Sequence, residues 1–186
     1  VPYSSAAVSK PTFIDIEDAS WMWGILITDK DRVSTTGICN FPSHMGSLNY
    51  GYASVGGWRR ISPKLYNQIP ESDVRKGWFL DDTGVSVNLP AAAQAYITKK
   101  GAPVYTQVKY GPMNDEWGSN NNATDVILMR VEEMYLIKAE AQAMNNDVSG
   151  GVNTLNSFVN TYRDPSYKCT ATTGEAVQEA VWHQRR

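Results

Sequence analysis

A group of aromatic residues set among glycines carries the clearest chemistry in this sequence. Tyr50, Tyr52 and Trp58 occur in a segment, 41–58, that also holds four glycines and few aliphatic residues. Glycine contributes no side chain to a core, so this composition does not favour a well-packed strand. A flat aromatic face can stack on a pyranose ring while polar groups around it bind the hydroxyls. The pattern predicts a sugar-binding surface, and the alternative is a set of rings that fill a core beneath long loops.

Trp117 is a further candidate for ligand binding because its neighbours in the sequence are polar. These neighbours are Asn114, Asp115, Glu116 and Asn120. Amide and carboxylate groups of this kind can bind the hydroxyls of a sugar that stacks on the indole ring. The predicted ligand-binding residues are therefore Trp58, Tyr50, Tyr52 and Trp117, with Trp58 ranked first.

Three other tryptophans are predicted to be structural. Trp21 and Trp23 are two residues apart at the start of an apolar run, so period-two alternation places both on one face of a strand. We expect that face to lie in the core. Trp78 and Phe79 follow a short basic segment and are likewise expected to pack inside the protein.

Groups that could catalyse a reaction are sparse. His44 follows Ser43, but a nucleophile and its base need a geometry that the fold supplies. We expect His44 to make a polar loop contact instead. Glycoside hydrolysis needs two carboxylates about 5 to 9.5 Å apart across the scissile bond, which the adjacent acidic pairs at 81–82 and 115–116 do not favour. We predict no catalytic residue and no enzyme, with a glycoside hydrolase as the least favoured alternative.

Composition and motifs bound the partners of the chain. The formal net charge is -2 and no basic stripe is present, so nucleic-acid binding by phosphate neutralisation is not expected. Phosphate-binding glycine motifs, zinc-ligand spacing and EF-hand patterns are absent, and we predict no cofactor and no metal. A structural calcium in the acidic loops remains an alternative. Cys39 and Cys169 are too few for a disulfide framework and are either unpaired or joined in a single bridge.

Two predicted helices near the C-terminus provide a frame for these residues. Asp125 suits the N-cap of an apolar run that extends to Met144, and polar residues and glycines at 145–151 then break the run. Beyond the break, apolar residues recur at spacings of three, four and three and place one stripe on a second helix: Val152, Leu155, Val159 and Tyr162. The hairpin of about forty residues is close to the period of a tetratricopeptide-type repeat.

Charges within the first of these helices indicate that protein covers it. The run is apolar on nearly all sides and has about the length of a membrane span. Each charge at the bilayer centre would cost roughly 2.5 to 3.5 kcal/mol, which excludes a span. Arg130, Glu133 and Glu140 share one helix face and are predicted to satisfy one another as a structural ion pair. The alternative is a charged functional site.

The distribution of glycine and proline along the sequence predicts two domains, residues 1–124 and 125–186. The first holds eleven of the fourteen glycines and eight of the nine prolines, so many turns are expected. Its predicted elements are short: strands at 24–28 and 104–110, and helices at 62–68, 71–78 and 91–99. The second holds the hairpin and a further helix, opened by a capping box of Thr172 and Glu175.

A series of short motifs then links this chain to a known family. The motifs keep the family's order from Trp23 to Arg186. They are Trp23, Gly24, Ser43, His44, Met45, Ile69, 73–76, Trp78, Phe79, Asp125, Ile127, Met129, Arg130, Glu132, Glu133, Tyr135, Leu136, 139–141, Leu155, Asn156, Arg163, Val181, Trp182 and 184–186. By these residues the chain resembles the C-terminal portion of SusD/RagB proteins, the nutrient-binding lipoproteins of certain Gram-negative outer membranes. The resemblance implies a mainly α fold, in which a helical-repeat hairpin packs against an irregular loop-rich lobe with short strands and helices.

The resemblance also implies a function and a location. SusD-like proteins bind an oligosaccharide or another nutrient without cleaving it and deliver it to a TonB-dependent, SusC-like transporter. The expected location is the outer membrane, facing outward, with the lipid anchor and the N-terminal repeat region outside this chain. The resemblance does not specify the glycan, the oligomeric state or whether this portion binds ligand alone. A protein-interaction scaffold without glycan binding is the second hypothesis.

Overall fold

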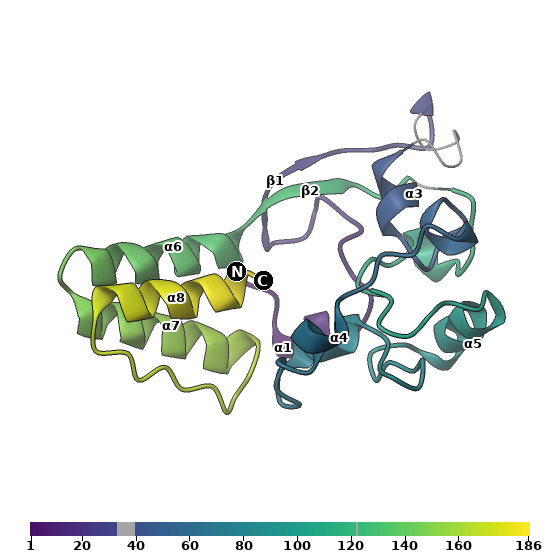
Figure 1. Ribbon diagram of the computed structural model, residues 1–186. Coiled ribbons are helices and arrows are strands. Elements are labelled where there is room, and N and C mark those ends of the chain that lie inside the picture. Colours follow the sequence, from purple (N-terminus) through teal and green to yellow (C-terminus); the bar gives the residue numbers. More distant parts are fainter. Residues whose placement is uncertain (33–39, 122) are drawn as a thin grey trace.

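The structure is a computed structural model that describes residues 1–32, 40–121 and 123–186. It has two parts of different character joined by a two-stranded ribbon (Figure 1). Three helices stack at one end and form the helical unit: α6 (Val131–Met144), α7 (Val148–Tyr162) and α8 (Gly174–Arg185). Short helices and loops form the loop-rich lobe at the other end. The predicted mainly α fold, with a helical hairpin against a loop-rich lobe, is confirmed.

The ribbon consists of β1 (Trp21–Ile25) and β2 (Val126–Arg130), which pair antiparallel. The prediction that 126–130 are helical is wrong. A run of four apolar residues, 126–129, fits a strand or a helix equally well, and pairing with β1 selects the strand. Asp125 is therefore not a helix cap. Its carboxylate instead accepts hydrogen bonds from the backbone N–H groups of Ile16 and Ile27, each at 2.7 Å.

The alternation predicted for Trp21 and Trp23 is interrupted in β1. The register of the ribbon shifts between Trp21 and Trp23 and again between Trp23 and Gly24, and such irregularities change the face on which a side chain points. Trp21 is partly buried and its indole N–H donates to the hydroxyl of Tyr3 at 2.7 Å. Trp23 is 63% exposed, so the prediction that it lies in the core is wrong.

The helical unit is built on a continuous apolar core. Its fully covered residues come from all three helices and from the segment that leads into α8: Leu136, Ala139, Ala143, Leu155, Phe158, Val159, Cys169, Val177 and Val181. Gly150 and Gly151, predicted as part of the turn, lie inside α7. A Cβ on Gly151 would stand 2.7 Å from the carbonyl oxygen of Ala139, so glycine permits the close approach of α7 to α6.

Polar groups define the ends of these helices. Asp147 accepts a hydrogen bond from the N–H of Gly150 and caps α7. Thr173, and not the predicted Thr172, caps α8 through the N–H of Ala176. The hydroxyl of a capping threonine accepts a hydrogen bond from the N–H three residues ahead. A shift of one residue in the start of the helix therefore changes which threonine is the N-cap.

The ion pairs of the helical unit differ from the prediction. Arg185 of α8 pairs with Glu133 at 2.8 Å and with Glu140 at 2.7 Å, so α8 and α6 are joined by charge. Arg130 does not join them, because it ends β2 and pairs with Glu132 at 3.5 Å. The predicted structural role of these charges holds, but the partners are different.

The loop-rich lobe contains helices of one to three turns, separated by loops. Their bounds are α1 (Ser5–Val8), α3 (Phe41–Met45), η1 (Ala53–Val55), α4 (Pro63–Tyr66), η2 (Val74–Trp78), α5 (Ala91–Lys99) and η3 (Met113–Asp115). The helices predicted near 62–68, 71–78 and 91–99 are confirmed as α4, η2 and α5. The strand predicted at 104–110 makes isolated bridges through Thr106, Gln107 and Tyr110. Two small apolar clusters fill the lobe, one around Leu48 and Leu80 and one around Tyr3 and Phe13.

Two further sequence questions concern a disulfide and the membrane. Cys169 is buried in the core of the helical unit, while Cys39 lies outside the described residues, so a bridge between them stays an open alternative. No helix in the described part of the chain is long and apolar enough to cross a membrane.

Candidate ligand-binding surface

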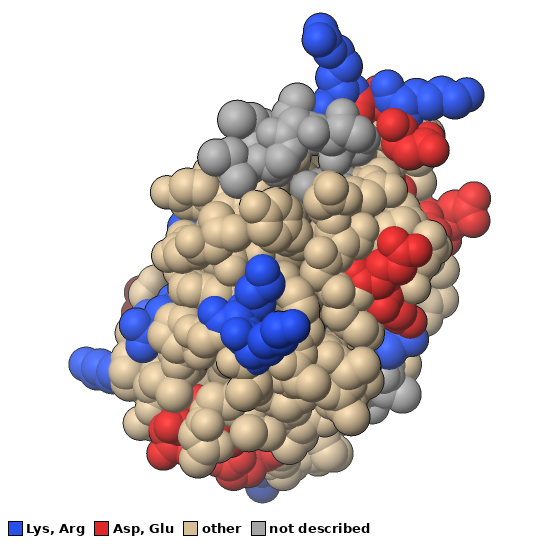
Figure 2. All heavy atoms as spheres, turned by 90° about the vertical axis from the view of Figure 1, so that its right-hand side faces the viewer, with Lys and Arg blue, Asp and Glu red and all other residues tan. Residues whose placement is uncertain are grey.

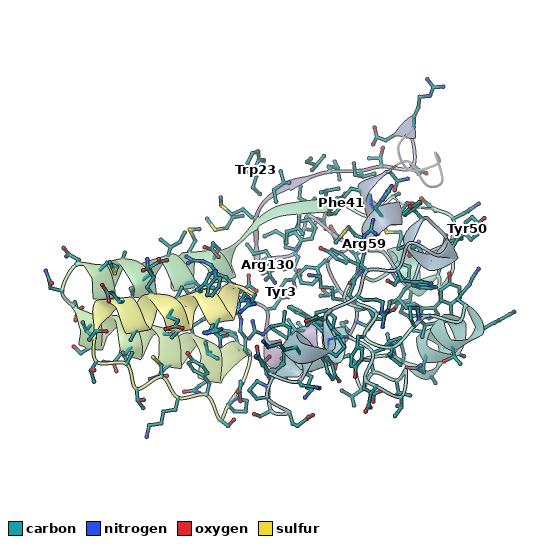
Figure 3. The ribbon with its side chains drawn as sticks, in the orientation of Figure 1. Tyr3, Trp23, Phe41, Tyr50, Arg59 and Arg130 are labelled. Atoms are coloured by element: carbon teal, nitrogen blue, oxygen red, sulfur yellow. The ribbon has the colours of Figure 1, made fainter. Side chains whose placement is uncertain are left out.

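Three exposed aromatic side chains lie on α3 and on the loop that follows it. Phe41, Tyr50 and Tyr52 expose 46%, 46% and 41% of their surface, and we call them the aromatic strip. In Figure 3, Phe41 and Arg59 lie in the loop-rich lobe and Tyr50 lies at its outer edge, away from the helical unit. Large exposed rings held by short elements are suited to stacking on a ligand.

Local hydrogen bonds explain how α3 and the loop position these rings. Asn40 caps α3 by accepting from the N–H of Ser43, and the Ser43 hydroxyl accepts from the N–H of Tyr52 at 2.9 Å. Between the two tyrosines, a Cβ on Gly51 would stand 2.8 Å from that same hydroxyl. Gly51 therefore lets the loop pass close to α3, and this contact fixes the backbone that carries Tyr50 and Tyr52.

Tyr52 belongs to a small polar and aromatic group. Its ring stacks on His44 with 4.6 Å between the centroids, and the Arg59 guanidinium lies 5.8 Å from the ring centroid. Arg59 also lies 3.2 Å from Nδ1 of His44. The prediction that His44 makes a polar loop contact is confirmed. The group places the Arg59 guanidinium beside an exposed ring, and polar groups placed in this way can fix the orientation of a ligand.

Tyr50 lies beside a lysine. The ammonium of Lys100 stands 5.3 Å from the centroid of the Tyr50 ring and 5.7 Å from that of Tyr96. The hydroxyl of Tyr96 donates to the carbonyl oxygen of Asn49 at 3.2 Å, and burial raises the pKa of Tyr96. Figure 2 views this end of the molecule and shows a group of basic side chains near the middle of a mostly uncharged face.

Trp58 and Trp117 occupy a different environment from the two tyrosines. Both are partly buried and pack against the core cluster that contains Leu48 and Val108. Trp117 also borders a shallow groove of about 740 Å³, together with Thr12, Val87, Leu89, Pro90 and Asn114. The structure thus brings Tyr50 and Tyr52 into one exposed loop and gives Trp58 and Trp117 a share in packing. Ligand binding by all four remains a prediction.

Phe41 was missed by the sequence reasoning, although a signal for it exists. The order Asn40, Phe41, Pro42 is typical of a helix start, with an N-cap followed by proline in the first turn. These residues place Phe41 at the first position of α3, where its side chain is 46% exposed.

The acidic residues of the lobe serve its own backbone. The carboxylate of Asp81 accepts from the N–H groups of Thr83 and Val85 at 2.8 and 2.9 Å. Burial raises the pKa of Asp81, but these hydrogen bonds outweigh it and the net shift is downward. Within the described ranges, no three His, Cys, Asp or Glu side chains gather as a metal site.

The chain has a likeness among solved structures. No protein-family profile and no curated protein matches the chain. Among solved structures, it is similar to the crystal structure of a SusD-like carbohydrate binding protein from Bacteroides vulgatus. The identity is 23% and the TM-score is 0.62, over 100% of this chain and 34% of the other. The likeness is one of fold, and the chain spans about a third of the length of that protein.

Proposed function

We propose that this chain is part of a SusD/RagB-type protein and binds a carbohydrate without cleaving it. The observation that carries the proposal is the aromatic strip, in which the backbone beneath Tyr50 and Tyr52 is fixed by the contact of Gly51 and Tyr52 with Ser43. Its setting supports the proposal, because the fold resembles that of a carbohydrate-binding protein. The function is capture, with no group acting on a scissile bond.

Binding would combine stacking with hydrogen bonds from charged groups. Tyr50 and Tyr52 supply apolar ring faces, and aromatic contacts of this kind contribute about 0.5 to 1.5 kcal/mol each beyond burial. Arg59 and Lys100 lie next to these rings and can donate to hydroxyl oxygens. Trp58 and Trp117, both partly buried, are proposed to contribute through their remaining exposed edges. The sum of several such contacts fits a weak, reversible capture.

The cellular setting follows from the same proposed membership. The protein would lie at the outer membrane and face outward, held by a lipid anchor outside this chain. It would pass its ligand to a TonB-dependent, SusC-like transporter. Fast transfer needs a ligand that is released without covalent chemistry, which agrees with binding on an exposed strip.

An interaction scaffold is a second candidate function, favoured by one specific feature. The ribbon exposes apolar side chains that would be costly to leave in water, namely Met22, Trp23, Ile25, Leu128 and Met129. A scaffold would use this surface and would leave the aromatic strip without a ligand. Capture of the transporter by the full-length protein, lost in a Trp23→Ser variant and unaffected by every strip variant, would favour it.

Isothermal titration of the full-length protein against a panel of neutral oligosaccharides tests the proposed function. We expect Tyr50→Ala and Tyr52→Ala each to weaken binding about two- to tenfold, because a lost stacking contact costs about 0.5 to 1.5 kcal/mol. Trp58→Ala and Trp117→Ala test the other two candidates. Trp182→Ala, which removes an exposed ring on α8, is the matched control and should not change the affinity. Binding by wild type that survives all four strip and tryptophan changes would refute the site.

A further inference from the structure

A cleft of about 390 Å³ lies between the ribbon, η2 and the ends of α6 and α8. Its walls hold six cationic side chains: Arg75, Lys109, Arg130, Arg163, Arg185 and Arg186. Figure 3 shows Arg130 where the helical unit meets the loop-rich lobe, while Tyr50 lies at the opposite edge of that lobe. The cleft is therefore separate from the aromatic strip.

Lys109 is the cation with the least compensation. Its ammonium lies 5.2, 5.7 and 5.9 Å from the ring centroids of Tyr110, Trp78 and Phe13. Among the described residues, no carboxylate forms an ion pair with it. Burial lowers the pKa of Lys109, and repulsion from Arg130 lowers it further. Contact with aromatic rings offsets only part of the cost of burying an ammonium group.

The neighbouring cations already occupy the carboxylates within reach. Asp73 pairs with Arg75 at 2.6 Å, and Glu132 lies 3.5 Å from Arg130. The buried Arg163 donates instead to the neutral Gln184, to its carbonyl oxygen at 2.7 Å and its side-chain oxygen at 3.2 Å.

The charge balance of the cleft is therefore positive. Four cations, Arg75, Lys109, Arg130 and Arg163, share the two carboxylates of Asp73 and Glu132, an excess of two positive charges. Arg185 pairs with both Glu133 and Glu140, and Arg186 adds one more cation, so these two further cations and two further carboxylates leave the excess at two.

The shape of the cleft indicates a small organic ligand. The volume lies within the range of pockets that hold small molecules, about 300 to 1,000 Å³. Trp78 provides an apolar wall beside Lys109. Glu132 adds an acceptor in the same wall, since its Oε2 is buried without a donor while its Oε1 accepts from the N–H of Tyr3.

We propose that this cleft binds an anionic oxygen group, a carboxylate or a sulfate, carried by a small ligand. The anion would lie between Lys109 and Arg130, with the body of the ligand against Trp78. A charge-assisted hydrogen bond from each cation to the oxyanion would stabilise it. The inference is independent of the aromatic strip, and either site can fail without the other.

Thermal unfolding of the full-length protein with added anions tests this proposal. Sodium glucuronate and sodium sulfate are compared with sodium chloride at matched ionic strength, and glucose is the neutral analogue. We expect glucuronate or sulfate at 10 mM to raise Tm, because a ligand that binds only the native state stabilises it. Chloride and glucose should not. A response to sulfate alone keeps the proposal with an inorganic ion as the source, and a response to glucuronate identifies an organic acid.

Variants at Lys109 connect the response to the cleft. Lys109→Met should weaken the anion response at least tenfold, while its Tm without anion stays equal or rises, since an uncompensated buried charge is removed. Lys109→Arg keeps the charge and should keep the response if Lys109→Met does not fold. Lys64→Met, at an exposed position of α4 that belongs neither to the cleft nor to the aromatic strip, is the matched control. Equal Tm shifts for all four solutes in wild type, or an unchanged shift in Lys109→Met, would overturn the proposal.

Discussion

The helical unit and the loop-rich lobe are stabilised by different kinds of contact. In the helical unit, apolar residues from three helices meet in one core, with Phe158 and Val159 almost fully buried. In the lobe, two smaller clusters are supplemented by buried polar side chains that bind distant backbone groups. Asn88, for example, donates to the carbonyl oxygens of Val8 and Val74, each at 3.2 Å.

This difference bears on which part of the molecule can present side chains to a ligand. A periodic apolar core leaves few side chains free for a ligand, because its faces are turned inward. A lobe held by hydrogen bonds between side chains and distant backbone groups can leave Tyr50 and Tyr52 exposed while the backbone beneath them is fixed. In the proposed function, the helical unit is the frame and the loop-rich lobe carries the ligand-binding rings. The following predictions test that division, starting with the largest expected effect.

Phe158→Ala should cost the most stability, about 3 to 5 kcal/mol in the free energy of unfolding. The side chain is 2% exposed and stacks on Tyr135 with 5.2 Å between the ring centroids. Its removal leaves a cavity in the core of the helical unit. Urea unfolding followed by far-ultraviolet circular dichroism measures the loss. Ser157→Ala, at the exposed neighbouring position of α7, is the control and should be close to neutral.

Asp125→Ala tests the hydrogen bonds between side chains and backbone that hold the lobe. It should lower the free energy of unfolding by about 2 to 3 kcal/mol. The substitution leaves the N–H groups of Ile16 and Ile27 without their shared acceptor, and hydrogen bonds to charged groups are the stronger kind. Asp125→Asn keeps one acceptor oxygen and should lose about half as much. If Asp125→Ala is neutral in urea unfolding, the lobe is held by its apolar clusters and the contrast with the helical unit disappears.

Asp147→Ala tests how much the N-terminal cap of α7 stabilises the helical unit. It should lower the free energy of unfolding by about 1 kcal/mol. The carboxylate caps α7 by accepting from the N–H of Gly150 at 2.9 Å. Asp147→Ser keeps a capping oxygen and should recover most of the stability. Thermal unfolding of the three proteins side by side gives the ranking. A loss as large as that of Phe158→Ala would show that the core is not the main support.

The pH dependence of stability should show the smallest effect. Burial raises the pKa of Tyr167 to about 12, with a further contribution from Cys169, whereas an unfolded tyrosine titrates near 10. The stabilisation is present below pH 10 and is lost as pH rises through about 12, because the unfolded chain ionises first. Solvent screening at this half-buried ring keeps the effect below about 1 kcal/mol. Tyr167→Phe should show a shallower fall in urea midpoint between pH 9.5 and 11.5, and an identical fall would assign the dependence to other groups.

The sequence predicted the helical unit better than the lobe, for a physical reason. The stripe from Val152 to Tyr162 follows from local periodicity, and α7 contains it. The strand β2 could not be told from a helix, because its partner β1 lies about a hundred residues earlier in the chain. Periodicity says nothing about a contact over that separation.

The candidate surface was predicted in part for the same reason. Glycine spacing correctly placed Tyr50 and Tyr52 in an exposed loop, since it reports local crowding. The partial burial of Trp58 and Trp117 depends on a cluster that includes Leu80 and Ile97, which come from other segments. The cationic cleft likewise gathers Arg75, Lys109, Arg130 and Arg163 from four distant positions, and the sequence shows none of that convergence.

The direct passage of β2 into α6 has a mechanical consequence. Arg130 is the last residue of the strand and the N-cap of the helix, and the N–H of Val131 donates to the carbonyl oxygen of Ser20 at 2.9 Å. Between β2 and α6 there is no loop residue that could act as a hinge. The ribbon and α6 therefore move together as one rigid element. An anion bound to Arg130 would restrict motion at this junction. By linkage, the orientation of the ribbon relative to the lobe would then change the affinity for the anion.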